Sequence, residues 1–202
     1  MKLYYKSGAC SLSPHIVALE AGLDIAIEAV NLQTKLTESG ANFLEANPKG
    51  AVPALALDDG TLLTEGAVIV QYLADQAPAS GLLPTGGTAR YKVQEWLNFV
   101  ATELHKGFSP FFNPATPDAY KDVARANLVR RYTYLESTLA DGRAYLTGET
   151  FTVADAYAYV VLSWNAASGV DLTAYPKLSA FFARVGARPK VQAARKAEGL
   201  AA

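Results

Sequence analysis

The sequence has few of the residues that build covalent or metal-bound frameworks, with one cysteine and two histidines in 202 residues. A single cysteine cannot form a disulfide within the chain. One cysteine and two histidines also argue against a structural zinc site, which usually takes four such ligands. We expect no metal, and the composition fits a reducing compartment in which thiols stay reduced.

An excess of charge of one sign is also missing. The chain has 18 basic and 19 acidic residues, which gives a formal net charge of −1. Such a balance provides no broad positive surface to neutralise nucleic-acid phosphates or to dock on anionic lipid. The composition therefore favours a small-molecule ligand and excludes nucleic acid and membranes as expected partners.

Long hydrophobic runs are absent as well. No uninterrupted apolar stretch approaches the roughly 20 residues that a membrane-spanning helix needs. The segment Met1 to Lys6 contains no apolar signal core. We therefore expect a cytoplasmic protein. Because 50% of the residues are hydrophobic, the chain has enough apolar material for one large or two small cores.

The first half of the chain predicts a sheet connected by a helix. Short apolar or alternating segments bounded by turn residues are typical of strands. The expected strands are residues 3–5, 25–32, 54–57 and 61–63. Residues 14–21 have the spacing of a helix that Gly22 would end. Strand, helix and strand in this order predict a parallel pair joined by a right-handed crossover, and the last two strands predict a β-hairpin.

Two further elements are expected before the middle of the chain. Residues 33–50 are polar and predict a loop with a short helix near 41–46. Thr64 is expected to cap a helix that begins at Glu65. The first-turn amides of that helix would have no partner within it.

The rest of the chain reads as a second, helical domain. Structure-breaking residues fill positions 79–87, so we predict domains at 1–78 and 88–202 with a linker between them. In the second domain, apolar residues recur at spacings of three and four. They are Val93, Trp96, Leu97, Val100 and Leu104, and later Leu128, Tyr132, Leu135 and Leu139. Thr152 and Asp155 have the spacing of a capping box, which makes Asp155 a structural residue.

Cys10 lies where the first strand meets the first helix, within the segment Ser7 to Pro14. A helix N-terminus carries unpaired N–H groups and partial positive charge, which lower the pKa of a thiol from about 8.5 toward neutrality. The sequence therefore predicts a reactive thiolate. The alternative is that Cys10 is a small buried apolar residue.

A strand, a cysteine at a helix start, a second strand and a proline that opens a hairpin form the pattern of a thioredoxin-like domain. Four short motifs in order make the resemblance specific. They are Gly8–Ser11, Asn47–Leu55, Leu63–Gly66 and Phe151–Ala156. Together with the segment Ala101–Phe108, they make the chain resemble a bacterial glutathione S-transferase of the beta class over nearly its whole length.

This resemblance implies an α/β thioredoxin-like N-terminal domain and an all-α C-terminal domain, the glutathione transferase fold. It also implies glutathione as co-substrate, a hydrophobic electrophile as second substrate, a detoxifying activity and a homodimer. Within the class, Cys10 lies by the glutathione sulfur and can form a mixed disulfide. Most other transferases use a hydroxyl there, for which Ser11 is a better candidate than Tyr5. We expect Cys10 to contact the sulfur, with Ser11 and His105 assisting.

The same resemblance suggests how the rest of the tripeptide is bound. Val52, before a Pro53 that the family implies is cis, can offer its N–H and C=O to an extended peptide. Glu65 can pair with the ligand's α-ammonium group, although a first-turn acid can also simply complement the helix dipole. The N–H groups of Gly66 and Ala67 can hold the neighbouring carboxylate. Many relatives have serine where Gly66 stands, so a hydroxyl contact is missing here.

Candidates for the remaining contacts come from two places. Lys35 is a candidate for the glycine carboxylate. Asn98, Thr102 and His105 share one helix face, which is either a solvated surface or, as the family implies, a glutathione contact completed across a dimer interface. His15 is expected to be a packing or surface residue.

The second substrate and the balance of activities stay open. Several aromatic side chains and one proline predict an apolar pocket beside the sulfur, unless they are ordinary core. They are Phe108, Pro110, Phe111, Phe112 and Trp164. We expect a transferase with thiol–disulfide exchange through Cys10. The alternatives are a protein that is mainly a glutathione-dependent thiol oxidoreductase, or a non-catalytic glutathione-binding scaffold.

Overall fold

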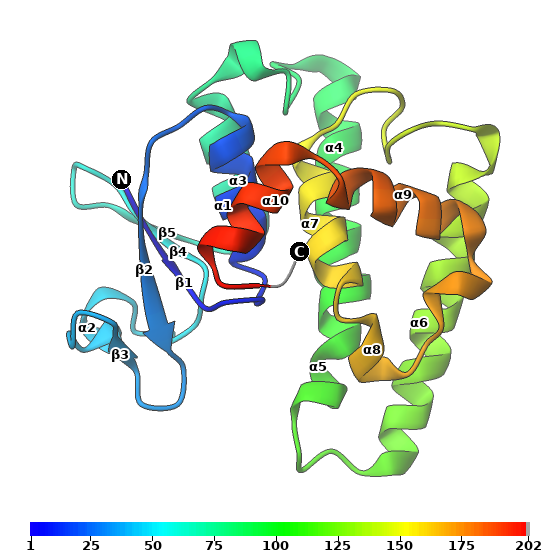
Figure 1. Ribbon diagram of the computed structural model, residues 1–202, viewed down its shortest axis with the longest axis horizontal. Coiled ribbons are helices and arrows are strands. Elements are labelled where there is room, and N and C mark those ends of the chain that lie inside the picture. The colour runs from blue at the N-terminus through cyan, green and yellow to red at the C-terminus, as the bar shows by residue number, and fades with distance from the viewer. Residues whose placement is uncertain (201–202) are drawn as a thin grey trace. The chain divides into compact units, whose positions relative to one another are not determined.

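The computed structural model describes residues 1–200, which divide into two compact units (Figure 1). Among the described residues, the first unit contains 1–85 and 188–200, and the second contains 86–187. None of the helices in the described part combines the length and the apolarity that crossing a membrane requires. No three His, Cys, Asp or Glu side chains in that part are grouped so that they could hold a metal ion.

The first unit is built on a five-stranded sheet with the order β3-β2-β1-β4-β5. The strands are β1 (Lys2–Tyr5), β2 (Ala26–Asn31), β3 (Leu36–Thr37), β4 (Ala54–Ala56) and β5 (Leu62–Thr64). β1 pairs parallel with β2 and antiparallel with β4, while β4 and β5 form an antiparallel hairpin. The predicted parallel pair and hairpin are confirmed, whereas the two-residue strand β3 was not predicted.

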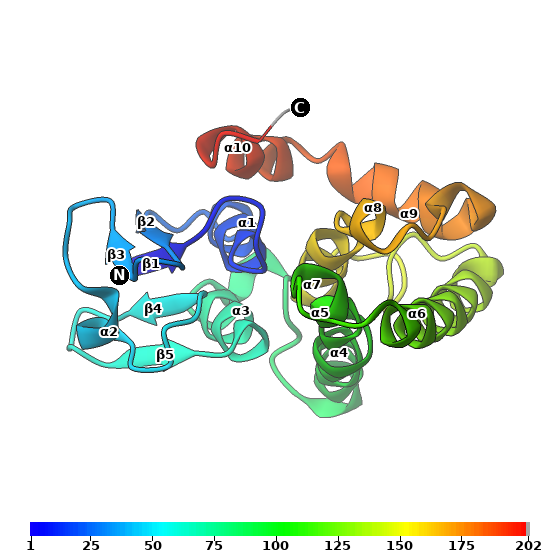
Figure 2. The same cartoon turned by 90° about the horizontal axis from the view of Figure 1, so that it is seen from below.

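Helices cover both faces of this sheet (Figure 2). The helices α1 (Leu12–Glu20) and α3 (Gly66–Asp75) pack on one face, and the short α2 (Phe43–Ala46) covers the other. Phe43 is fully buried there and lies 5.3 Å from the ring of Tyr4. The prediction that Thr64 caps α3 is wrong, because Thr64 still belongs to β5 and Glu65 occupies the N-cap position with a positive φ of 68°.

The last helix, α10 (Pro189–Ala197), packs on α1 in the first unit. The sequence-based division placed residues 88–202 in one helical domain, so the structure differs here. An ion pair accounts for part of this packing: Arg188 donates from its guanidinium to Glu20 of α1 at 2.7 and 2.8 Å. The end of the chain thereby becomes part of the α/β unit.

The second unit is helical. Its longer helices are α4 (Gly87–Phe99), α5 (Lys106–Phe112), α6 (Asp118–Thr138), α7 (Val153–Leu162) and α9 (Pro176–Gly186), and α8 is a single turn (Asn165–Ser168). A π-helix, η2 (Val100–His105), joins α4 to α5. The predicted core positions from Val93 to Leu104 and from Leu128 to Leu139 are buried.

The capping box at the start of α7 is confirmed. Asp155 is fully buried, and its Oδ2 accepts hydrogen bonds of 2.8 Å from both the N–H and the hydroxyl of Thr152. Its Oδ1 accepts another from the N–H of Leu146 at 2.8 Å. Burial raises the pKa of Asp155 to about 6, although these three hydrogen bonds oppose the shift. Asp155 therefore ties the start of α7 to the loop before it.

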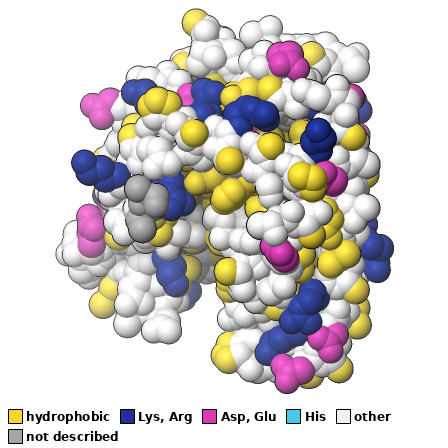
Figure 3. Space-filling view, turned by 45° about the vertical axis from the view of Figure 1, so that its right-hand side comes forward, with side chains coloured by type: hydrophobic (Ala, Val, Ile, Leu, Met, Phe, Trp, Pro, Cys, Tyr) yellow, Lys and Arg dark blue, Asp and Glu magenta, His cyan; other side chains and the backbone are white. Residues whose placement is uncertain are grey.

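The surface agrees with the balanced composition. On the face drawn in Figure 3, Lys and Arg side chains are interspersed with Asp and Glu, and apolar side chains lie between them. This face carries no continuous basic patch.

Candidate functional site

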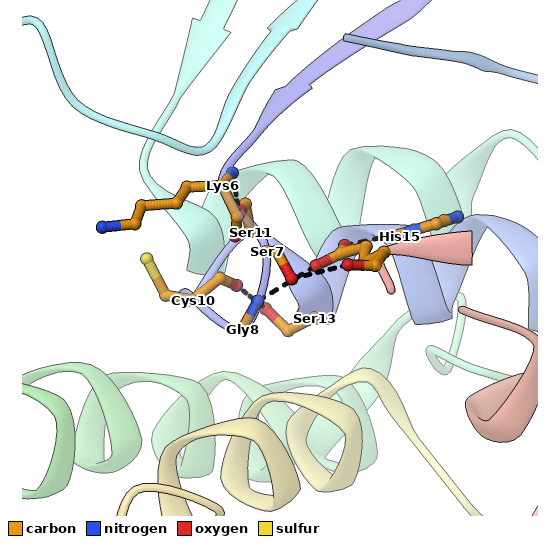
Figure 4. Close-up of polar contacts among 8 residues, drawn as sticks. Lys6, Ser7, Gly8, Cys10, Ser11, Ser13 and His15 are labelled. Carbon is orange, nitrogen blue, oxygen red and sulfur yellow. Dashed lines mark hydrogen bonds and ion pairs between the residues drawn. The ribbon is translucent and has the colours of Figure 1, made fainter. Parts of the chain in front are cut away.

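Cys10 lies in the turn between β1 and α1, two residues before the helix begins. Its side chain is half-buried, and Sγ donates a hydrogen bond to the carbonyl oxygen of Val52 at 3.3 Å. In Figure 4 the Cys10 and Lys6 side chains extend to the same side of this turn. The structure thus brings together Cys10 and Val52, two predicted site residues that are 42 positions apart in sequence.

Ser11 has a different place from the one predicted. It is fully buried, and its hydroxyl accepts a hydrogen bond from the N–H of Lys6 at 3.1 Å and donates one to the carbonyl of Lys6 at 3.2 Å. Because the hydroxyl closes the turn and is out of contact with solvent, this geometry does not fit a donor to a ligand sulfur. Ser11 instead holds the turn that carries Cys10.

The same turn is held from the C-terminal end of the chain (Figure 4). Ser7 donates from its hydroxyl to the carbonyl of Glu198 at 2.6 Å, and the N–H of Gly8 donates to Glu198 Oε2 at 3.3 Å. Glu198 Oε1 also lies 3.0 Å from Nδ1 of His15, which is buried in α1. His15 is therefore a packing residue, one of the two roles expected for it, and Glu198 is a supporting residue that the sequence analysis missed.

Val52 precedes a cis peptide bond to Pro53, as the family resemblance implied. The carbonyl of Val52 accepts the hydrogen bond from the Cys10 thiol. No residue in the described part of the chain accepts a hydrogen bond from the N–H of Val52. Asn47 stabilises the preceding loop by donating from its side-chain amide to the carbonyl of Ala51 at 2.8 Å. Val52 thus presents an open backbone donor two residues before β4, and an extended peptide can hydrogen-bond to it.

Glu65 stands at the N-terminus of α3 with 70% of its side chain exposed. Its carboxylate Oε1 lies 2.9 Å from Nζ of Lys49, which also donates to the hydroxyl of Thr64 at 2.9 Å. Within residues 1–200, no group accepts a hydrogen bond from the N–H of Gly66 or Ala67. A carboxylate, an ammonium group and two open amides therefore adjoin one another at this helix start.

Two lysines, Lys35 and Lys49, lie at the loop before Val52. Lys35 has a positive φ of 60°, and its Nζ donates to the carbonyl of Gly50 at 2.7 Å. Lys49 was not among the predicted site residues. The one available signal was its position inside the motif Asn47–Leu55, because nothing in the spacing shows that it reaches Glu65, 16 residues away.

The second unit contains Asn98, Thr102 and His105, which were predicted to share one helix face. Only the first two of them lie together on the exposed surface. Asn98 and Thr102 are exposed, and the hydroxyl of Thr102 donates to the carbonyl of Asn98 at 3.0 Å. His105 ends the π-helix η2, whose wider turn breaks the α-helical phase. As a result, His105 is partly buried, with Nδ1 only 2.6 Å from the hydroxyl of Tyr157.

Burial also sets the protonation of His105. Burial and, to a smaller extent, the charge of the adjacent Lys106 together lower the pKa of the imidazole to about 4. His105 is therefore neutral near pH 7, where one ring nitrogen donates and the other accepts. An imidazole with so low a pKa is a weak base, so hydrogen bonding to a thiolate suits His105 better than proton abstraction does.

Two of the predicted aromatic residues, Phe108 and Phe112, contact Trp164, and Phe111 contacts Phe108. The ring of Trp164 lies 5.0 Å from His105, 5.9 Å from Phe108 and 5.5 Å from Phe112. Phe108 is fully buried, whereas Phe112 is 55% exposed. The cluster therefore combines ordinary core with an exposed apolar surface that continues from the histidine.

Comparisons with known proteins agree with this fold and site. The family model for the glutathione S-transferase N-terminal domain matches residues 8–76, and that for the C-terminal domain matches residues 99–189. The chain is 50% identical to the glutathione S-transferase GstA of Escherichia coli O157:H7, over 99% of this chain and 100% of that protein. The chain belongs to the glutathione S-transferase family.

Solved structures show which class of glutathione S-transferase the chain resembles. A sphingomonad glutathione S-transferase complexed with glutathione is 48% identical, with a TM-score of 0.95 over 100% of both chains. A bacterial beta-class enzyme from Sphingomonas chungbukensis is 43% identical, with a TM-score of 0.95 over 100% of both chains. The predicted resemblance to the bacterial beta class is confirmed, and the protein is a glutathione transferase with glutathione as co-substrate.

Proposed function

We propose that the protein conjugates the glutathione thiolate to hydrophobic electrophiles and carries out thiol–disulfide exchange through Cys10. The observation that carries this proposal is the 3.3 Å contact between Cys10 Sγ and the carbonyl of Val52. It places a thiol against the backbone segment to which an extended tripeptide can add as a strand. A sulfur on that tripeptide then lies close to Cys10.

The helix start of α3 suits the γ-glutamyl end of glutathione. Glu65 would pair with the α-ammonium group, while the open N–H groups of Gly66 and Ala67 would hold the α-carboxylate, which the helix dipole also favours. Lys49 keeps the Glu65 carboxylate oriented before the ligand arrives. We assign Lys35 to the glycine carboxylate, because its ammonium group already reaches the loop before Val52.

The proposed sulfur chemistry has two forms. In conjugation, the glutathione thiolate attacks an electrophilic carbon and forms a C–S bond, while the bond to the leaving group breaks and that group, for example chloride from a chloronitrobenzene, departs with the electron pair. His105 contributes a hydrogen bond to the sulfur. In exchange, the Cys10 thiolate attacks one sulfur of oxidised glutathione, the original S–S bond breaks, a new S–S bond forms and a glutathione thiolate leaves. We propose that the exposed part of the Trp164 cluster receives the electrophile, because an aromatic surface favours apolar substrates.

We also propose a homodimer that works in the cytoplasm and detoxifies electrophiles. Asn98 and Thr102 support the dimer, because they are exposed polar residues of a helix and would complete a glutathione site from a second copy. A cytoplasmic setting would keep the single cysteine reduced between turnovers.

Replacing Cys10 with alanine separates the two activities. We expect conjugation of a chloronitrobenzene to survive with kcat/KM reduced by about tenfold at most, the effect of one weak hydrogen bond. Formation of the mixed disulfide with oxidised glutathione should disappear, because no other cysteine exists in the chain. Steady-state kinetics measures the conjugation, and the mass of the intact protein shows whether the mixed disulfide forms.

The same experiment tests the alternatives. If the protein is mainly a thiol oxidoreductase, wild-type conjugation is marginal and Cys10→Ala abolishes nearly all glutathione-dependent turnover. If it is a scaffold, the wild-type protein is retained on immobilised glutathione but turns over no electrophile. Either result would contradict the proposed transferase activity.

A further inference from the structure

His105 is one of two histidines in the chain, and its environment in the second unit is well defined. Its Nδ1 lies 2.6 Å from the hydroxyl of Tyr157, a buried residue of α7. The ring also meets Tyr157 and Trp164 edge-on, with centroids 5.9 and 5.0 Å apart. These contacts fix the orientation of the imidazole and leave Nε2 as the ring nitrogen opposite the phenol.

The hydrogen bond between Nδ1 of His105 and the Tyr157 hydroxyl can form in two ways, which differ in the atom that donates. Either the Tyr157 hydroxyl donates to Nδ1, so that the proton of a neutral ring lies on Nε2, or Nδ1 carries the proton and donates to the phenol. With an oxygen as acceptor, O–H donors reach shorter distances (about 2.5–3.0 Å) than N–H donors do (about 2.7–3.2 Å). The 2.6 Å distance therefore favours the hydroxyl as donor.

We propose that Tyr157 is a positioning residue that holds His105 in the Nε2–H form, so that His105 acts as a fixed hydrogen-bond donor and not as a base. This rests on the proposed contact between His105 and the glutathione sulfur. An N–H donor stabilises a thiolate, whereas a bare nitrogen at the same place would favour the protonated thiol. No proton needs to move during the reaction for this role.

The π-helix gives the proposal its structural basis. A continuous α-helix would place His105 on the stripe of Asn98 and Thr102, both of which are exposed. The wider turn of η2 instead directs it toward Tyr157. Such π-helical turns are rare in general, yet they occur frequently at functional sites. Here the turn creates the phenol–imidazole contact.

The decisive experiment is nitrogen NMR of the ligand-free protein labelled with 15N-histidine. Two imidazole systems are expected, and a His105→Gln sample identifies the signals of His105. In the wild-type protein near neutral pH, Nδ1 of His105 should be the unprotonated nitrogen and Nε2 the protonated one. In Tyr157→Phe the two tautomers should exchange, with averaged nitrogen shifts.

Tyr132 offers a matched control. It is a buried tyrosine of α6 in the same unit, and its hydroxyl has no hydrogen-bond partner among the described residues. Tyr132→Phe should leave the His105 signals unchanged. A proton on Nδ1 in the wild-type protein, or identical His105 signals in Tyr157→Phe and wild type, would overturn the proposal.

Kinetics then link the tautomer to the reaction. We expect Tyr157→Phe to lower kcat/KM for glutathione conjugation by about 3- to 10-fold, the effect of one hydrogen bond. Adding His105→Gln should cost little more than His105→Gln alone, because Tyr157 acts through His105. Fully additive losses would contradict a positioning role. If the wild-type protein shows no conjugation, the proposed function fails, whereas the NMR result still decides the tautomer.

Discussion

Replacing Asp155 with alanine should lower the free energy of unfolding by about 3–5 kcal/mol. The substitution removes the acceptor of three buried hydrogen bonds, two from Thr152 and one from Leu146. Each donor left without a partner inside the protein costs about 1–3 kcal/mol. Denaturant unfolding followed by tryptophan fluorescence suits this test, because Trp96 and Trp164 both lie in the second unit with Asp155.

Asp171 provides the control for this substitution. It also accepts hydrogen bonds from a threonine, at 2.9 Å from the N–H and 2.7 Å from the hydroxyl of Thr173, but it is exposed. Asp171→Ala should therefore cause a clearly smaller loss, because water replaces the carboxylate. Equal losses in the two variants would show that the buried capping box contributes nothing beyond an ordinary helix cap.

Because the pKa of Asp155 is raised, the free energy of unfolding should depend on pH. The pKa is about 6 in the folded protein and about 3.9 in an unfolded chain. Between these values the folded state binds more protons, so stability present below about pH 4 is lost as the pH rises through about 6. The wild-type protein should lose stability relative to Asp155→Asn across this window. A difference that stays constant from about pH 4 to pH 7 would contradict the assignment.

Replacing Glu65 with glutamine should raise the KM for glutathione by about 10- to 100-fold with little change in kcat. The loss of a charge-assisted hydrogen bond to the ligand's ammonium group costs about 1.5–3 kcal/mol, and each 1.4 kcal/mol is tenfold in affinity. Binding by calorimetry and steady-state kinetics should agree, because the interaction is made equally in the ground and transition states.

Glu95 is a matched control for Glu65. It is an exposed glutamate paired with a lysine, Lys92, at 2.5 Å, as Glu65 is paired with Lys49. Glu95→Gln should leave the KM for glutathione unchanged. A normal KM in Glu65→Gln would exclude the helix start of α3 as the γ-glutamyl site, whatever the state of Cys10.

The sequence was sufficient for elements whose signals are local. The strands of the hairpin, the helical core positions and the Thr152–Asp155 capping box all follow from spacings of two, three or four residues. β3 was missed because two residues show no alternation. Thr64 was misjudged as a cap because Glu65 adopts a positive φ, a conformation that its residue type does not announce.

The parts of the site that could not be predicted depend on distant contacts. Glu198 meets His15 across 183 positions, and only the folded chain shows that the last helix belongs to the first unit. The role of Ser11 depended on whether its hydroxyl points into the turn or out of it. Cys10, Val52 and Pro53, by contrast, were predicted together because two family motifs mark them, and the structure places Cys10 and Val52 in hydrogen-bond contact.

The central claim is that the first unit holds glutathione with its sulfur beside Cys10. The most direct test follows the mass of the intact protein during incubation with oxidised glutathione and, separately, with cystine at the same concentration. We expect one glutathione per chain, removed by reductant, at a rate about tenfold or more above that of cystine, because the tripeptide site positions the disulfide. This preference should be lost in Glu65→Gln. Absence of the adduct, or equal rates with the two disulfides, would contradict the account.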